Sequence, residues 1–156
     1  MTTPDRSKRS LILEALVTRL EAIRRAPFET RAGRTVLVGE VPDLGPDDPD
    51  EVIVLALGEE VLGTQMRKLV VTWPIEIQAR VKATSERAWV TREQLVADIQ
   101  RAIELDDDQT LGGLLVKPGI QGGAIRTFDR EPGSTTLAAG VRYELEFWRS
   151  WGHPEG

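Results

Sequence analysis

The stretch Thr72-Trp73-Pro74-Ile75-Glu76-Ile77-Gln78-Ala79-Arg80-Val81-Lys82 alternates between two kinds of side chain. Its odd positions are apolar, and its even positions other than Pro74 are polar or charged. A period of two residues places these sets on opposite faces of a β-strand. The sequence therefore predicts one long strand with a buried face and a polar face. Pro74 lacks an amide hydrogen, so this part must lie at a sheet edge, a bulge or a strand start.

Two amphipathic helices are predicted, one on each side of this strand. The first runs from about Pro4 or Asp5 to Arg25, before Pro27 prevents continuation. Its apolar residues recur at three- and four-residue spacing and predict a buried stripe of Leu13, Leu16, Val17, Leu20 and Ile23. The second helix is predicted to begin at Thr91, which can form a capping box with Gln94. Its predicted buried stripe is Leu95, Ile99, Ala102 and Ile103.

Shorter patterns complete the predicted fold. Further strands are expected at residues 35–38, 52–57, 114–116, 125–128 and 136–149, with turns at 58–64 and 121–123. The resulting order is α-β-β-β-α-β-β-β. This order predicts an α+β fold, in which two helices pack on one face of a mostly antiparallel sheet.

Length and composition indicate one soluble domain spanning residues 1–156. Hydrophobic residues make up 40% of the chain and charged residues 29%, as in ordinary globular proteins. There is no cysteine, so disulfides and thiolate metal sites are excluded, in keeping with a reducing cytoplasm. Neither a signal peptide nor a membrane span is expected. Residues 150–156 are expected to form a flexible tail.

The charges are unevenly distributed along the chain. Residues 1–34 contain eight Lys/Arg and four Asp/Glu, whereas residues 40–60 contain eight acids and no base. Three prolines and four aspartates within residues 41–50 predict an exposed acidic loop at about 41–51. Because its spacing is not that of an EF-hand, we expect turns there rather than a Ca²⁺ site.

This asymmetry suggests contacts between basic and acidic segments, either within one chain or head-to-tail between subunits. Asp106-Asp107-Asp108 likewise follow the second helix at its unfavourable, negative end, so a contact with arginine or with a neighbour is a candidate there beside a solvated end. The overall net charge of −5 argues against general nucleic-acid binding. The charged residues expected at subunit or partner contacts are Arg24, Arg25, Arg31, Arg34, Asp47, Asp48 and Asp50.

No reaction centre is visible in the sequence. The single histidine, His153, lies in the tail, where neither a catalytic triad nor a zinc site could be held. Gly112-Gly113 and Gly122-Gly123 lack the context of a phosphate-binding loop. Paired carboxylates remain open, because any two of the 25 acidic residues could meet in space. We therefore predict a protein that is not an enzyme and has no catalytic residue, cofactor or metal.

Four of the eight aromatic residues are tryptophan. Trp73 and Trp89 adjoin apolar patterns and are predicted to lie in the core or at the domain edge. Trp148 falls on the polar face of the last strand, and Trp151 follows in the tail. Large aromatic residues in such positions are enriched at protein interfaces, so both are candidate contact residues. Packing of Trp148 on the first helix of the same subunit is the alternative.

In order along the chain, these features resemble the tail terminator proteins of long-tailed, siphovirus-like bacteriophages. The resemblance begins with an amphipathic helix ending near Arg24-Arg25 and a Pro/Asp-rich stretch leading into an apolar strand at residues 49–57. It continues through the strand of residues 69–79, which precedes the second helix. The most specific parts are Leu111-Gly112-Gly113 and the ending Trp151-Gly-His-Pro154.

The resemblance implies a structural virion protein that forms a homohexameric ring in the phage tail and is made in the host cytoplasm. The ring would cap the tail tube protein, end tube polymerisation and offer a surface to the head–tail joining protein. DNA would pass through the ring without specific binding, and no membrane would be involved. Two alternatives are a tail-completion or head–tail connector protein of similar fold and, more remotely, a small bacterial α+β ligand-binding module or enzyme.

Overall fold

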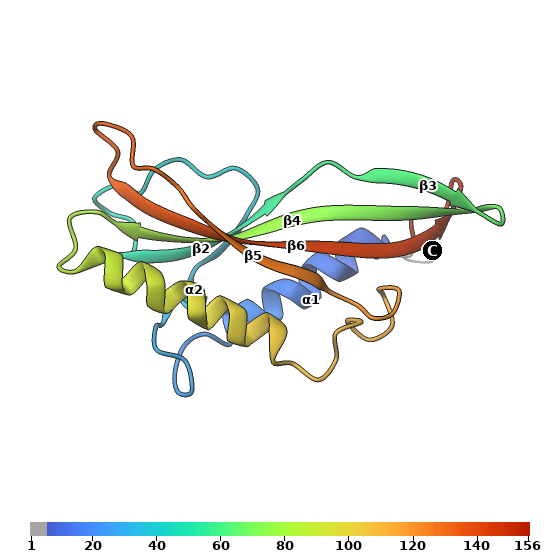
Figure 1. The fold of residues 1–156 in the computed structure, drawn as a ribbon, viewed down its shortest axis with the longest axis horizontal. Coiled ribbons are helices and arrows are strands. Elements are labelled where there is room, and N and C mark those ends of the chain that lie inside the picture. The colour runs from blue at the N-terminus through green and yellow to red at the C-terminus, as the bar shows by residue number, and fades with distance from the viewer. Residues whose placement is uncertain (1–5) are drawn as a thin grey trace, which may run out of the picture.

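The computed structural model describes residues 6–156, which form one α+β domain built on a six-stranded sheet (Figure 1). This confirms the predicted fold class. The elements in chain order are α1 (Lys8–Glu21), the 3-10 helix η1 (Ala32–Arg34), β1 (Val36–Val38), β2 (Glu51–Leu57), β3 (Val61–Gln65), β4 (Lys68–Lys82), α2 (Ala88–Glu104), β5 (Gln121–Thr127) and β6 (Thr136–Ser150).

The sheet is centred on two long antiparallel strands, β4 and β6. They pair along their full lengths of 15 residues, from Lys68↔Ser150 to Lys82↔Thr136. The strand order is β1-β2-β4-β6-β5, and β3 pairs with the first part of β4 on the same flank as β2. Only the β1–β2 pair is parallel. The sheet is therefore mostly antiparallel, as the sequence predicts.

Both helices lie on the same face of the sheet (Figure 1). The odd-numbered residues of β4 from Val71 to Val81 point to this face and are all buried, so the alternation predicted for residues 72–82 is confirmed. Trp73 is completely buried and packs edge-on against Phe147 of β6, with their ring centroids 6.5 Å apart. The predicted stripe of α2 is also confirmed, because Leu95, Ile99, Ala102 and Ile103 are buried.

The first helix is shorter than predicted and is rotated slightly. The Ser7 side chain caps its N-terminus by accepting a hydrogen bond from the Ser10 amide at 3.1 Å; the predicted start at Pro4 or Asp5 lies outside the described residues. The helix ends at Glu21 rather than Arg25. The fully buried residues are Ile12, Leu16, Leu20 and Ile23, whereas Leu13 and Val17 are only partly buried.

The predicted capping box of α2 is wrong. The helix begins at Ala88, one turn before Thr91, and its N-cap Arg87 has a left-handed backbone with φ 53° and no side-chain cap. A tight turn that leads directly from β4 into the helix overrides the local sequence preference here. Thr91 consequently lies inside the helix.

Three of the predicted strands and turns also differ. Residues 58–64 include most of β3 rather than a turn, and residues 114–116 form a turn rather than a strand. The observed order therefore has four strands before α2 and two after it. The predicted turn at residues 121–123 lies inside β5, where Gly122 and Gly123 have φ values of 106° and 111° and form a bulge against β6.

Pro74 lies in the middle of β4, but at a local edge. Pairing with β2 ends at Leu57↔Ile75, and pairing with β3 begins at Val61↔Thr72, so no strand pairs with Pro74 on that side. Gly58 crosses this gap: its amide donates to the Pro74 carbonyl at 2.8 Å, and its own carbonyl accepts from the Trp73 indole at 3.0 Å. A Cβ at Gly58 would lie 2.5 Å from that Pro74 oxygen, so only glycine fits.

A buried aspartate, which the sequence analysis missed, joins α2 to the segment after α1. The Asp98 carboxylate is completely buried and accepts hydrogen bonds from the amides of Glu29 and Thr30, at 2.7–3.0 Å, and from the Thr30 hydroxyl at 2.8 Å. Arg101 forms an ion pair with it at 2.8 Å. A buried charge with this many donors fixes the position of the whole segment.

We expect Asp98→Ala to lower the free energy of unfolding by about 3 kcal/mol, because it leaves the buried donors of Glu29 and Thr30 without an acceptor. Urea denaturation followed by circular dichroism measures the change. The control is Asp107→Ala at an exposed position, which should alter stability by less than about 0.5 kcal/mol. Equal effects of the two substitutions would contradict the anchoring role of Asp98.

Candidate functional site

The acidic loop, residues 41–51, lies against the sheet face opposite the helices. Leu44 is its one buried residue between 41 and 50 and packs with Val52 and Val54 of β2. The Leu44 amide donates to the Thr136 hydroxyl at 2.9 Å, and the Leu44 carbonyl accepts from Thr135 at 2.8 Å. The loop is thus tied to β2 and to the start of β6 while its aspartates remain exposed.

Basic residues on the polar face of β4 also hold this loop. The Arg80 guanidinium donates to the Val41 and Pro42 carbonyls. Lys82 donates to the Pro46 carbonyl at 3.1 Å and lies 3.8 Å from the Asp50 carboxylate. The expected pairing of acidic and basic groups within one chain is therefore present, but its basic partner is β4 rather than the first helix.

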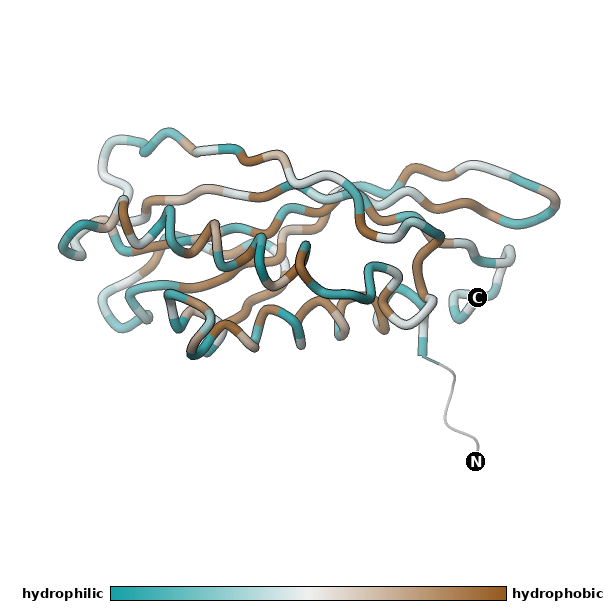
Figure 2. Tube along the Cα trace, turned by 60° about the horizontal axis from the view of Figure 1, so that its bottom comes forward, coloured by the Kyte–Doolittle hydropathy of each residue, from teal (hydrophilic) through white to brown (hydrophobic). Residues whose placement is uncertain are grey.

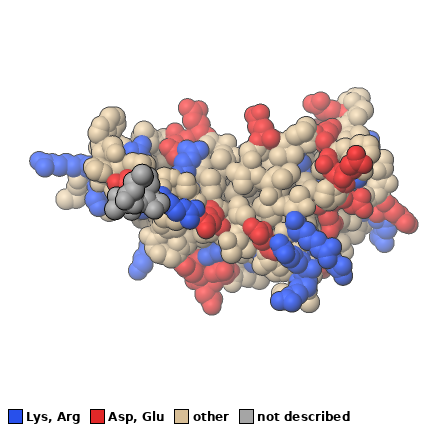
Figure 3. Space-filling model, turned by 180° about the vertical axis from the view of Figure 1, so that it is seen from behind, with Lys and Arg blue, Asp and Glu red and all other residues tan. Residues whose placement is uncertain are grey.

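The predicted contact residues fall into two groups at opposite ends of the molecule. Arg31, Arg34 and Asp50 come together around an open cavity of about 720 Å³. Separate basic and acidic patches are visible at this end in Figure 3. The remaining predicted charges, at Arg24, Arg25, Asp47 and Asp48, are exposed there too. Trp148 lies on β6 beside the β3–β4 hairpin, where it pairs with Val70 of β4, and Trp151 follows the end of β6.

That hairpin forms a projection that the helices do not cover. We call residues 61–70 and 148–150 the β-arm; they comprise β3, its turn, the start of β4 and the end of β6. The β-arm extends past the helices at one end of the molecule and carries hydrophobic segments along its length (Figures 1 and 2). Its exposed apolar side chains are Val61, Leu62, Met66 and Trp148, with exposed fractions of 63, 51, 92 and 37%.

The base of the β-arm is tied to α1. Arg9 forms an ion pair with Glu60 at 2.8 Å and stacks over the Trp73 ring at 4.2 Å. Lys8 donates from its side chain to the Trp148 carbonyl at 2.6 Å, and the Lys8 amide donates to the Pro154 carbonyl at 2.9 Å. The C-terminal tail therefore folds back beside the start of α1, and its flexibility stays a prediction.

Two tryptophan predictions can be compared with the structure. Trp73 is in the core, as predicted, whereas Trp89 is 60% exposed at the start of α2 and belongs to the domain edge. Trp148 points away from the helix face and lies beneath the Lys68 ammonium, 5.7 Å from the ring centroid. It consequently does not pack on α1, and the alternative considered for it is excluded.

A charged cluster occupies the middle of the open sheet face. Glu76 is largely buried and forms ion pairs with Arg126 at 2.8 Å and with Arg142 at 3.2 Å. Gln78 donates to the same carboxylate at 2.9 Å. Burial acts to raise the pKa of Glu76, but the hydrogen bonds from Arg126, Gln78 and Arg142 outweigh it, so the pKa lies below its ordinary value.

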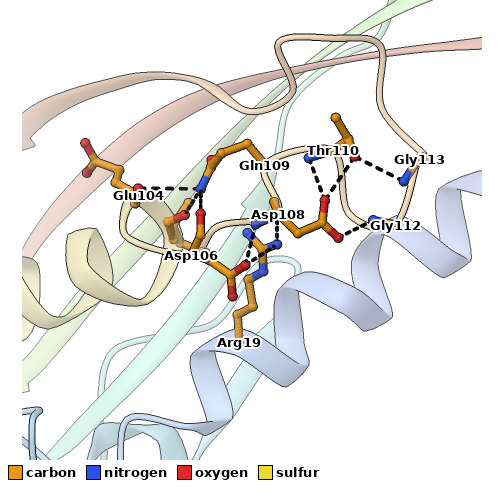
Figure 4. A network of polar contacts seen from close by, with 9 residues as sticks. Arg19, Glu104, Asp106, Asp108, Gln109, Thr110, Gly112 and Gly113 are labelled. Atoms are coloured by element: carbon orange, nitrogen blue, oxygen red, sulfur yellow. Dashed lines mark hydrogen bonds and ion pairs between the residues drawn. The ribbon is translucent and has the colours of Figure 1, made fainter.

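The three aspartates after α2 are held by the same chain (Figure 4). Arg19 of α1 pairs with Asp106 at 3.2 Å and donates to the Asp108 carbonyl. The Gln109 side chain donates to the Ile103 carbonyl at 2.9 Å, which satisfies the helix end. Asp108 accepts from the Thr110 and Gly112 amides and orders the Gly-rich turn. Of the alternatives considered for this helix end, the contact with an arginine of the same chain is the one present, and this cluster joins the two helices.

The structure assembles no recognisable reaction centre within residues 6–156. His153 is exposed in the tail, with Glu155 as its partner at 3.1 Å. Among these residues, no group of three or more His, Asp or Glu side chains is placed to hold a metal ion. Over the same range, every helix is too short or too polar to cross a membrane. The β-arm, with its exposed apolar side chains, is therefore the main candidate for a functional surface among the described residues.

No protein-family model matches this chain, and no curated protein matches it significantly.

We expect Gly140→Ala to destabilise the protein by about 1–3 kcal/mol. A Cβ at Gly140 would lie 2.6 Å from the Glu76 carboxyl carbon, which Arg126 and Arg142 hold in place. The cost should shrink in a Glu76→Ala background, and thermal or urea denaturation of the four proteins in this cycle measures the coupling. Gly63→Ala is the control, because its nearest neighbour would be 3.8 Å away. A cost that is the same in both backgrounds would contradict the predicted clash.

The Glu76 cluster also predicts a pH dependence of stability. Because folding lowers the pKa of Glu76, its contribution is fully present above the unfolded-state pKa and is lost as the pH falls through the folded-state value. The difference in unfolding free energy between the wild type and Glu76→Gln should therefore be largest near neutral pH and decrease below about pH 4. Urea titrations at several pH values measure it; a difference that stays constant would contradict the prediction.

Proposed function

We propose that this protein is a tail terminator of a long-tailed bacteriophage: a structural protein that closes into a ring on the tail tube, ends tube polymerisation and presents a surface to the head–tail joining protein. The single observation that carries the proposal is the uncovered β-arm, with four exposed apolar side chains on strands that extend past the core. Val61 and Leu62 point to opposite faces of the β-arm, so apolar side chains are exposed on both of its faces and are available to a partner. The resemblance described above supplies the kind of assembly.

Three further features support an assembly role. The fold contains the features on which the resemblance rests, namely a first amphipathic helix, an apolar strand after the Pro/Asp-rich stretch and a long strand before the second helix. A role that rests on shape and surface is compatible with the described residues, among which no group of three or more His, Asp or Glu side chains is placed to hold a metal ion. The sheet also has free edges at β1, β3 and β5, each of which pairs with one strand only. Free edges are available for contact with other chains.

The acidic loop suits a ring through which DNA passes. Residues 40–51 contain six acids and no base, and most of these side chains are exposed. Carboxylates lining an opening repel DNA phosphates and so prevent adhesion. In this proposal the part of the loop that no neighbouring chain covers faces the channel or its rim, and DNA is not bound specifically.

We expect the purified protein, added to the polymerising tube protein of the same phage, to stop tube elongation and to appear as a ring of six chains at the tube end. Electron microscopy of tube lengths and native mass spectrometry of the ring measure both properties. Asp107→Ala, at an exposed site away from the β-arm, is the control and should act like the wild type. Tubes of unchanged length would contradict the proposal.

Phage particles that lack the protein separate the two assembly roles. Over-long tails are the expected result for a terminator, because nothing else would end tube growth. Heads with unattached tails of normal length would instead indicate a head–tail joining role. Catalytic turnover of a small molecule by the purified chain would overturn both roles.

A further inference from the structure

The β-arm is basic as well as apolar. Residues 61–70 and 148–150 contain three basic residues, Arg67, Lys68 and Arg149, and no acidic residue. Within residues 6–156, Arg67, Lys68 and Arg149 make no ion pair or side-chain hydrogen bond, and the Lys68 ammonium lies 5.7 Å from the centroid of the Trp148 ring. The β-arm therefore offers an apolar surface bordered by unpaired positive charge.

A surface of opposite charge lies at the other end of the molecule. The edge strand β1 exposes Leu37 and Val38, with exposed fractions of 36 and 46%. It leads directly into residues 40–51, the acidic loop together with Glu40, which we call the acidic segment. Glu40 and Asp47 of this segment make no hydrogen bond or ion pair within the described residues. Leu44 and the basic residues of β4 hold the loop in place, so a partner would meet a surface that is already ordered.

We infer that the β-arm of one copy of this chain docks onto β1 and the acidic segment of the next copy. Apolar side chains occur on both surfaces, and the unpaired charges beside them are of opposite sign. Because the two surfaces differ and lie at opposite ends of the molecule, the contact is heterologous and can repeat from copy to copy. The number of copies in a closed ring rests on the proposed function; the contact itself does not.

The positions of the basic residues along the molecule show which of them can meet the acidic segment of another copy. The arginines at positions 24–34 lie at the same end of the molecule as the acidic loop, and some of them share a cavity with Asp50. They cannot supply the opposite end of a head-to-tail contact. The basic residues of the β-arm can. Three basic residues around an apolar hairpin suit a protein surface better than DNA, which is bound through extended arrays of Lys and Arg.

Cross-linking tests the contact directly, because the chain contains no cysteine. Met66→Cys is mixed with Asp47→Cys and treated with a short bis-maleimide, and the products are separated by denaturing electrophoresis. A covalent dimer should form in this mixture. The yield of this dimer should be at least about tenfold lower when Met66→Cys is mixed with Asp107→Cys, an exposed control position after the end of α2. Absence of the dimer, or equal yields in both mixtures, would overturn the inference.

Charge reversal supplies a second, independent test. Arg67→Glu with Lys68→Glu places like charges together and should weaken self-association at least about tenfold, as should Glu40→Lys with Asp47→Lys. A protein carrying all four changes restores opposite charges and should regain association. Sedimentation equilibrium measures the dissociation constants, and circular dichroism confirms that each variant is folded. Loss without recovery in the combined variant would overturn the inference.

The outcomes distinguish this inference from the proposed function. If the β-arm variants still form rings but no longer stop tube growth, the β-arm contacts the tube protein and the inference is wrong. If cross-linking and charge rescue succeed while tube length is unaffected, the contact between copies stands and the terminator role is wrong.

Discussion

The structure depends on the unbroken pairing of β4 with β6 over 15 residues. At about 3.3 Å per residue these strands are about 50 Å long. The longer helix, α2, has 17 residues and at 1.5 Å per residue is about 26 Å long. Helices of this length cannot cover the whole strand pair. Most of the pair is buried as the core, and its last three residues at one end, 68–70 of β4 and 148–150 of β6, continue into the β-arm.

Along the paired strands β4 and β6, the groups that cover each face of the sheet change from the core to the β-arm. On the helix face, the core ends at Val71 and Phe147, just beyond Trp73, and Arg9 stacks over the Trp73 ring. On the opposite face, Glu76 draws Arg126 and Arg142 together across the central strands, and Gly140 leaves the space that its side chain needs. Beyond Pro74 the charged cluster ends, and beyond Val71 neither β3 nor β4 has a buried side chain. The apolar residues of the β-arm are exposed for this reason.

The fold class was predicted correctly from periodicity. The alternation of residues 72–82 and the apolar stripe of α2 each require one buried face, whichever element covers it, and so they are visible in the sequence alone. What failed depended on tertiary context. Val61 to Gln65 has no alternating pattern, since both of its faces are exposed, and so β3 was predicted as part of a turn. Thr91 offered a good local cap, but the left-handed Arg87 starts the helix earlier. Asp98 carries no local signal of burial, because its partners are the distant amides of Glu29 and Thr30.

The candidate surface was predictable only in part. Trp148 was identified because its aromatic side chain interrupts a polar face, and the acidic loop was visible from composition. Arg67 and Lys68 gave no signal, since two adjacent basic residues at a turn are common. They become candidate contact residues only because the β3–β4 hairpin places them at the end of the molecule opposite the acidic loop. Strands twist along their length, so a hairpin that prolongs the sheet presents its faces at an angle to the body. A contact made between such a hairpin and the far end of another copy includes a rotation between copies. Rotation at a heterologous contact is the condition for closing a ring instead of building a straight filament.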